Sequence, residues 1–246
     1  MKLSVLSDLH IQDSHDPAYE ALLRILKNQN SEDVLVLAGD IFDLFVGNKT
    51  LFKTRYDKFL ILLKKICEQG TEVHYIEGNH DFHLSSVFSR LPQFFLHSSA
   101  FEAHWGNCRF WIAHGDLVDL KDYRYLSLRT FFRSPLMQLF VATAPDSWIE
   151  WIGQTSSQKS REHRPRMPDQ LPPDQLQQLR EKYRSYAEKK MSFGYNFVIL
   201  GHCHDLDEAF SSCYMNMGFP KIHGSYIEWR PGSPKLERKP FFTSEK

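Results

Sequence analysis

Five short strand-like segments of this chain each run into a cluster of polar side chains, and this pattern constrains the fold more than any other feature. The five segments are 3–6, 33–38, 73–77, 109–113 and 197–200. Strands covered on both faces typically read as short, largely apolar runs. Helical patterns, with apolar residues three and four apart, separate the first three segments at 17–28 and 53–69. The alternation predicts an α/β fold built from βαβ units around a central sheet.

The second half of the chain contains further strand signals. Segments 101–105 and 109–113 flank a Gly-Asn pair, which is typical of a tight hairpin turn. Two strand-like pieces near the end of the chain, 221–229 and 236–241, are expected at the edge of a second sheet.

The region between the hairpin and the last buried strand has a different character. It is helical and rich in aromatic residues up to about Gly153, and then becomes polar, basic and proline-bearing over 155–173, which predicts a mobile connector. A further helix is expected over 173–191. The aromatic stripe between Phe131 and Trp151 is more typical of core packing than of a binding surface, and both interpretations stay open. The predicted core comprises 1–118 and 192–246, and the predicted helical, aromatic-rich cap comprises 119–191.

The polar clusters after the strands combine carboxylate, amide and imidazole groups. They are Asp8-x-His10, Gly39-Asp40, Gly78-Asn79-His80-Asp81, His114-Gly115-Asp116 and Gly201-His202-x-His204. Each cluster alone also fits an ordinary turn, a helix cap or a pair of surface histidines. Open α/β sheets, however, gather ligands at the carboxyl ends of their strands, so five clusters in these positions are expected to converge.

The side chains in these clusters suit divalent metal ions. The candidate ligands are Asp8, His10, Asp40, Asn79, His114, His202 and His204. Their mixture of oxygen and nitrogen donors suits Mn²⁺, Fe²⁺ or Zn²⁺, and Mn²⁺ is our first choice. So many ligands fit two ions about 3.5–4 Å apart that share one carboxylate, and Asp40 is the best placed to bridge them. The four cysteines have no Cys-x-x-Cys spacing, which predicts reduced thiols rather than a zinc knuckle.

Taken in order, these motifs resemble those of the calcineurin-like metallophosphoesterases, over residues 6–204. The resemblance implies a four-layer αββα sandwich with a helical cap and a binuclear centre that hydrolyses phosphoric esters and anhydrides. It implies that one ion is held by Asp8, His10, Asp40 and His204, and the other by Asp40, Asn79, His114 and His202. It also implies a catalytic role for His80, which would stabilise phosphoryl charge or protonate the leaving group, with Asp81 orienting His80.

Within that superfamily, the chain most resembles the bacterial UDP-2,3-diacylglucosamine pyrophosphatases of lipid A synthesis. Those proteins share the early Asp-x-His and carry an acyl-chain-binding helical insertion after His-Gly-Asp, where this chain has 119–153. The resemblance implies hydrolysis of UDP-2,3-diacylglucosamine to 2,3-diacylglucosamine 1-phosphate and UMP. The residues implied to contact the substrate are Asp122, Ser157, Lys159, Ser160 and Arg161.

Two departures from that subfamily keep other functions open. His80 stands where the best-known members carry arginine, and the segment 164–173, with four prolines, has no counterpart. A phosphatase or phosphodiesterase for a soluble nucleotide or phosphoprotein is therefore the second hypothesis. The third is a non-catalytic scaffold whose insertion binds a protein partner, although such scaffolds usually lose ligands and this chain keeps the full set.

Charge and hydropathy bear on location and partners. Lys+Arg and Asp+Glu both number 30, so no net field favours nucleic acid. The apolar N-terminal run is too short for a signal peptide, and no apolar run reaches the roughly 18 residues of a membrane span. We expect a cytoplasmic protein, peripheral on the inner membrane, that binds an anionic nucleotide-lipid; the oligomeric state stays open. Basic residues suited to that lipid are Arg124, Arg129, Arg133, Lys159 and Arg161.

Overall fold

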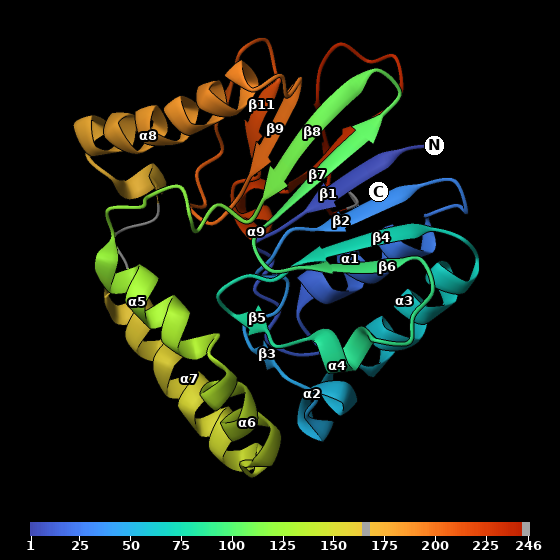
Figure 1. Ribbon diagram of the computed structural model, residues 1–246, viewed down its shortest axis with the longest axis vertical. Helices are drawn as coiled ribbons and strands as arrows, with labels where there is room; N and C mark the ends of the chain where they lie inside the picture. The colour runs from blue at the N-terminus through green and yellow to red at the C-terminus, as the bar shows by residue number, and fades with distance from the viewer. Residues whose placement is uncertain (164–167, 243–246) are drawn as a thin grey trace.

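The first of two sheets contains the strand segments from the N-terminal half of the chain (Figure 1). The computed structural model describes residues 1–163 and 168–242, apart from the side chains of 154, 156–163 and 169. The strand order is β13-β12-β1-β2-β4-β6, in which β1, β2, β4 and β6 run parallel. The bounds are β1 (Leu3–Leu6), β2 (Val34–Leu37), β4 (Glu72–Ile76), β6 (Phe94–His97), β12 (Ser225–Trp229) and β13 (Glu237–Pro240).

The second sheet has the order β10-β11-β9-β8-β7. Its strands are β7 (Ala100–Trp105), β8 (Cys108–Ala113), β9 (Phe197–Leu200), β10 (Glu208–Ala209) and β11 (Tyr214–Asn216). The antiparallel pairing of β7 with β8 confirms the predicted hairpin. Two short strands, β3 (Phe45–Val46) and β5 (Asp81–Phe82), form a separate parallel pair beside the candidate site.

Helices cover the outer faces of both sheets, which gives four layers (Figure 1). Between the sheets, Val5 and Val36 pack with Phe110 and Ile199 in one apolar cluster. Helices α1 (Pro17–Lys27) and α3 (Asp57–Glu68) bury their apolar faces on the first sheet, and α8 (Pro173–Ser192) buries Tyr183 and Ala187 on the second. This arrangement confirms the predicted αββα sandwich.

Two predicted elements differ from the structure. The helix expected over 53–69 is two helices, α2 (Thr50–Arg55) and α3, which part at Tyr56. Tyr56 is fully buried, and its hydroxyl donates to the carbonyl oxygens of Ile11 and Gln12, so this anchor outweighs helix continuity. The C-terminal strands extend the first sheet rather than the second, because β12 pairs with β1; strand periodicity does not specify a partner.

Three helices, α5 (Tyr123–Phe132), α6 (Pro135–Thr143) and α7 (Asp146–His163), form a cap at one side of the two sheets (Figure 1). Residues 155–163, the first part of the predicted connector, belong to α7. The predicted insertion over 119–191 also includes α8, which is a layer of the core and not of the cap. Three short helices complete the chain: α4 (Ser85–Phe88), the 3₁₀ turn η1 (Pro168–Gln170) and α9 (Pro220–His223).

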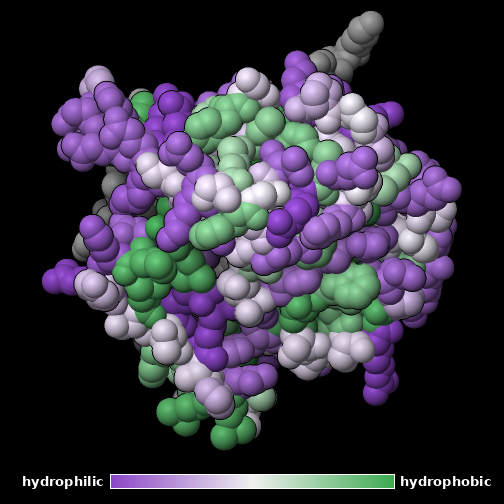
Figure 2. Space-filling view, turned by 45° about the horizontal axis from the view of Figure 1, so that its top comes forward, coloured by the Kyte–Doolittle hydropathy of each residue, from purple (hydrophilic) through white to green (hydrophobic). Residues whose placement is uncertain are grey.

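The cap presents much of its apolar surface to solvent. Val141, Ala144 and Ile149 are buried in the core cluster of the first sheet and attach the cap there. Leu139 and Trp148, in contrast, are 62% and 60% exposed, and further cap side chains exposed by more than half are Tyr123, Leu128, Phe131, Leu136 and Trp151. Hydrophobic side chains gather on this side of the molecule (Figure 2). Core packing therefore explains only a minority of the aromatic stripe.

None of the helices in the described part of the chain has the length and hydropathy needed to cross a bilayer.

Candidate metal centre

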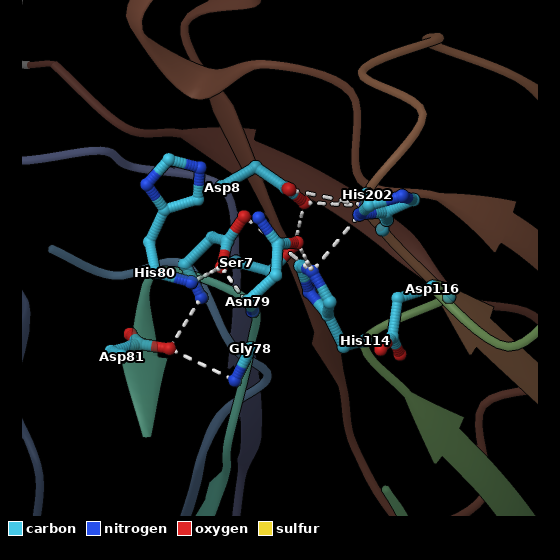
Figure 3. A network of polar contacts seen from close by, with 12 residues as sticks. Ser7, Asp8, Gly78, Asn79, His80, Asp81, His114, Asp116 and His202 are labelled. Carbon is cyan, nitrogen blue, oxygen red and sulfur yellow. Dashed lines mark hydrogen bonds and ion pairs between the residues drawn. The ribbon is translucent and has the colours of Figure 1, made fainter. Parts of the chain in front are cut away.

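The five polar clusters lie beyond the carboxyl ends of β1, β2, β4, β8 and β9, as the sequence predicts. Side chains of Asp8, Asn79, His114 and His202 point toward one another from these separate loops (Figure 3). The loops have unusual backbones: positive φ angles between 43° and 70° occur at Asp8, His10, Asp40, His202 and His204. Residues other than glycine rarely adopt this conformation, and where they do so at one place the strain typically serves function.

Asp40 lies at the centre of the cluster. One carboxylate oxygen, Oδ1, accepts hydrogen bonds from the backbone N–H groups of Asn79 and His80, both at 2.9 Å. The other oxygen, Oδ2, is 3.7 Å from His10 Nε2 and 3.5 Å from His114 Nε2. A single carboxylate oxygen therefore faces two groups of potential ligands. This is the geometry that the predicted bridging role of Asp40 requires.

The first group contains Asp8, His10 and His204, whose donor atoms lie within 4.8 Å of one another. The Nε2 atoms of His10 and His204 face each other at 3.1 Å, and His204 Nε2 is 3.5 Å from Asp8 Oδ1. Asp8 is held in place by its neighbours, since the Ser7 hydroxyl and the His202 backbone N–H donate to its carboxylate.

The second group contains Asp40, His114 and His202, again within 4.8 Å of one another. His114 Nε2 is 3.1 Å from the side-chain oxygen of Asn79 and 3.2 Å from His202 Nδ1. The other ring nitrogen of His114, Nδ1, donates to the carbonyl oxygen of Ala38 at 3.1 Å. This hydrogen bond sets the tautomer and leaves the Nε2 lone pair directed into the group, which is how metal-binding histidines are commonly oriented.

The electrostatics of the two groups favour an added cation. Burial disfavours protonation of His114, but the Asp40 and Asp8 carboxylates outweigh burial and raise the pKa of His114 to about 10. Burial also disfavours the charged form of Asp40, yet His114 and His80 hold the pKa of Asp40 well below its usual value. Carboxylates that stabilise a positive charge on a neighbouring ring this strongly, among converging nitrogen and amide donors, fit divalent metal ions.

Gly78 allows the Asp40 carboxylate to approach the third loop closely. A Cβ atom at Gly78 would overlap Asp40 Oδ1 and the Asp40 backbone nitrogen. Gly78 is absent from the residues with positive φ, so close approach, rather than a tight turn, explains this glycine.

His80 and Asp81, which the sequence predicts to act together, each contact other groups around the site. The His80 Nδ1 atom is 2.9 Å from the carbonyl oxygen of Asp43, and a His80 ring nitrogen lies within 4.8 Å of donor atoms of His10 and Asp40. Asp81, in turn, contacts the Asp40 loop: its carboxylate accepts from the backbone N–H groups of Asp40, Ile41 and Gly78 and from the Tyr75 hydroxyl. These contacts make Asp81 a positioning residue for Asp40, whereas the prediction assigned it to the His80 ring.

The ionisation of Asp81 is consistent with this positioning role. Burial, followed by the nearby Asp40 charge, raises the pKa of Asp81 to about 6. The hydrogen bonds from Tyr75, Gly78 and Asp40 act in the opposite direction because they favour the carboxylate. The carboxylate form of Asp81 accepts all of these hydrogen bonds.

A cleft of about 640 Å³ connects the ligand groups to the helices around them. Asp40, Asn79, His202 and His204 line it together with Asp122. Asp122 also caps α5, because its carboxylate accepts the Tyr125 backbone N–H at 3.0 Å. The other predicted substrate contacts fall on the C-terminal half of α7, and their side chains lie outside the described residues; they are Ser157, Lys159, Ser160 and Arg161.

Two arginines, Arg129 of α5 and Arg133 at its C-terminal end, attach the cap to the metal-site loops, a role that the sequence interpretation missed. Arg133 donates to the Glu77 carboxylate at 3.0 Å and to the carbonyl oxygens of Glu77 and Gly78 at 3.0 and 2.8 Å. Arg129 donates to the Asp116 carboxylate at 2.6 Å. Both side chains were expected to serve an anionic lipid. The available signal was their spacing of four residues, which places them on one face of the helix.

Replacing Arg133 by alanine is expected to lower the free energy of unfolding by about 3 kcal/mol, because the mostly buried Glu77 carboxylate loses its cationic partner. Turnover should also fall, because the loop that ends in Asn79 and His80 loses two anchoring hydrogen bonds. Urea unfolding and hydrolysis of a soluble chromogenic phosphodiester measure the two effects. Arg124→Ala, at an exposed position of α5, is the control. Equal stability of the two variants would contradict the anchoring role.

Comparisons with known proteins show which family the chain resembles. A family model described as calcineurin-like phosphoesterase matches residues 1–206. The UDP-2,3-diacylglucosamine hydrolase of Psychromonas ingrahamii is 25% identical over 208 residues, which cover 83% of this chain and 81% of that protein. The UDP-2,3-diacylglucosamine hydrolase of Neisseria meningitidis serogroup C / serotype 2a is 23% identical over 201 residues, covering 81% and 80%.

One similar solved structure is described as a novel archaeal phosphodiesterase. It aligns with a TM-score of 0.47 and 14% identity over 98% of this chain and 99% of that chain. The family match over 1–206 spans all five metal-ligand motifs and confirms the resemblance seen in the sequence. This chain therefore belongs to the calcineurin-like phosphoesterase family and is a metal-dependent phosphoester hydrolase.

Proposed function

We propose that this enzyme hydrolyses the pyrophosphate of UDP-2,3-diacylglucosamine to UMP and 2,3-diacylglucosamine 1-phosphate. The observation that carries the proposal is an exposed apolar cap next to a polar metal site. Leu139 and Trp148 of the cap are largely exposed, and Asp122 and Tyr125, at the start of α5, line the same cleft as His202. An anionic pyrophosphate with two acyl chains would suit a molecule that combines these two kinds of surface. The similar proteins of Psychromonas ingrahamii and Neisseria meningitidis, both called UDP-2,3-diacylglucosamine hydrolase, support the assignment.

Two divalent ions are proposed to occupy the two ligand groups, with Mn²⁺ as first choice and Fe²⁺ or Zn²⁺ as alternatives. The first would be held by Asp8, His10, Asp40 and His204, and the second by Asp40, Asn79, His114 and His202. Bound there, such ions stabilise negative charge on phosphoryl oxygens and lower the pKa of a bound water.

His80 is proposed to exchange a proton with the substrate. Its Nδ1 atom hydrogen-bonds the Asp43 carbonyl oxygen at 2.9 Å, which places the ring proton on Nδ1 and leaves Nε2 to act toward the substrate. In the hydrolysis, the oxygen of a water molecule bonds to one phosphorus, and the bond from that phosphorus to the bridging oxygen breaks. A proton from the water goes to the bridging oxygen as it leaves.

The substrate's sugar and lipid are proposed to lie on the cap side of the cleft. Asp122 would accept hydrogen bonds from the glucosamine, and Ser157, Lys159, Ser160 and Arg161 would contact the head group. The exposed apolar cap would rest against the cytoplasmic face of the inner membrane, from which it would take the lipid.

The test is release of UMP from UDP-2,3-diacylglucosamine in detergent micelles. We expect release with Mn²⁺ and none with excess EDTA. A variant with both Leu139→Ser and Trp148→Ser should show a KM for the lipid about tenfold higher, since apolar contacts with the acyl chains are lost. Its turnover of a soluble chromogenic diester should stay unchanged, because neither side chain lies in the buried core.

Absence of UMP release, together with fast hydrolysis of a soluble diester, would overturn the lipid substrate. That outcome would favour the second candidate, a phosphatase or phosphodiesterase for a soluble nucleotide or phosphoprotein. His80 is the feature that favours this candidate, because the best-known lipid A enzymes carry arginine in its place. A chain that binds no metal at all would instead support a non-catalytic scaffold.

A further inference from the structure

Helix α8 forms a wall of the cleft that contains the ligand groups. The cleft is lined by Asp40 and His202 and also by Gln175, Gln178 and Lys182 of α8. The positions 175, 178 and 182 lie three and four residues apart, so they share one face of the helix. All three side chains are exposed toward solvent in the cleft. Gln175 and Gln178 are therefore in a position to contact a substrate whose phosphates lie at the ligand groups, whereas Lys182 pairs with Asp119.

This wall is held rigidly relative to the ligands. Arg180 donates two hydrogen bonds to the Asp205 carboxylate, at 2.8 and 2.9 Å, and Arg184 donates two to Asp207, at 2.8 and 2.5 Å. Asp205 directly follows the candidate ligand His204. Paired hydrogen bonds of this kind set both distance and orientation, so they hold α8 at a defined distance from the site.

The chemistry of the wall suits a pyrimidine base. A glutamine carboxamide offers a donor and an acceptor side by side, which matches the adjacent N3–H and O4 of uracil. Two carboxamides, Gln175 and Gln178, are present on the cleft face of α8. Leu171 and Leu179 line the same cleft and supply apolar contacts for the faces of a ring.

We infer that the α8 face formed by Gln175 and Gln178 is the nucleobase subsite, and that it binds a pyrimidine. The inference rests on the proposed function, from which it takes the uridine nucleotide. In this arrangement the two ends of the substrate lie on opposite sides of the metal site. The base contacts α8, and the lipid contacts α5–α7. Asp122, at the start of α5, is on the lipid side of this division.

The test compares the binding of UMP and ribose 5-phosphate to the Mn²⁺-loaded chain by calorimetry. Both ligands carry the same phosphate, so the ratio of their dissociation constants isolates the contribution of the base. We expect Gln175→Leu and Gln178→Leu each to reduce the preference for UMP by about tenfold, as loss of hydrogen bonds to the base predicts. Gln177→Leu is the matched control, because Gln177 pairs with Glu181 and is not among the residues that line the cleft.

Each outcome decides the inference. An unchanged preference in both Gln175 and Gln178 variants, or equal binding of UMP and ribose 5-phosphate by the wild-type chain, would overturn it. Thermal unfolding of each variant is the control for the fold, and we expect the same midpoint temperature as for the wild-type chain. If the preference falls as expected while the lipid releases no UMP, the subsite stands and the lipid substrate falls. If the lipid does release UMP but the preference is unchanged, the subsite falls and the lipid substrate stands.

Discussion

Replacing Asp40 by alanine is expected to reduce phosphodiester hydrolysis by about a thousandfold or more and to remove bound metal. The reason is geometric: Asp40 Oδ2 faces His10 in one ligand group and His114 in the other. Loss of one side chain therefore weakens both groups at once. Initial rates on a soluble chromogenic diester, with metal content by elemental analysis, measure the two effects.

Two matched variants separate the charge of Asp40 from its structural contacts. Asp40→Asn keeps an oxygen that can accept from the Asn79 and His80 backbone N–H groups, so it should fold normally and still lose metal. Asp43→Asn removes a nearby carboxylate that contacts the His10 and His80 rings at 3.9 Å, and should cost no more than about a hundredfold. An Asp40→Asn chain that retains its metal and a tenth of its activity would refute the bridging role.

Replacing Asp81 by alanine is expected to lower the free energy of unfolding by about 3 kcal/mol or more, because buried backbone donors lose their acceptor. The Asp81 carboxylate is fully buried and accepts from the Asp40, Ile41 and Gly78 backbone and from the Tyr75 hydroxyl. Metal affinity should fall as well, since the Asp40 loop loses its anchor. Urea unfolding and metal titration measure these effects.

Tyr75→Phe is the matched control for this prediction. It removes only one of the donors to Asp81 and should cost about 1 kcal/mol, with metal affinity retained. If Asp81→Ala were as stable as Tyr75→Phe and lost only catalytic rate, Asp81 would act in the chemical step rather than in positioning.

The layers of the fold were largely predictable because they depend on local patterns. The buried strands β1, β2 and β9 read as apolar runs, and α1 shows helical periodicity. The same patterns misplaced elements where tertiary contacts prevailed. Tyr56 interrupts a continuous helical pattern because its buried hydroxyl donates a hydrogen bond to the carbonyl oxygen of Ile11. β12 pairs with β1, a partner that the strand pattern in the sequence does not specify.

The convergence of the ligand clusters was predictable for a related reason. Asp8, Asp40 and Asn79 each follow a parallel strand of the first sheet within three residues, so they were expected at one edge of that sheet. His114 and His202 follow neighbouring strands of the second sheet in the same way. Their donor types already indicate divalent metals. Strand position and side-chain chemistry together predicted the two groups of residues, and the packing of the two sheets brings their edges together.

The partner of each side chain was decided only by the tertiary structure. The motif order does not reveal that Asp81 holds the Asp40 loop, that Arg133 attaches the cap to Glu77, or that α8 is a wall of the cleft. Such contacts join segments far apart in the chain, and their geometry depends on how whole elements pack. A local pattern records which face of an element is buried, but not which distant group it meets there.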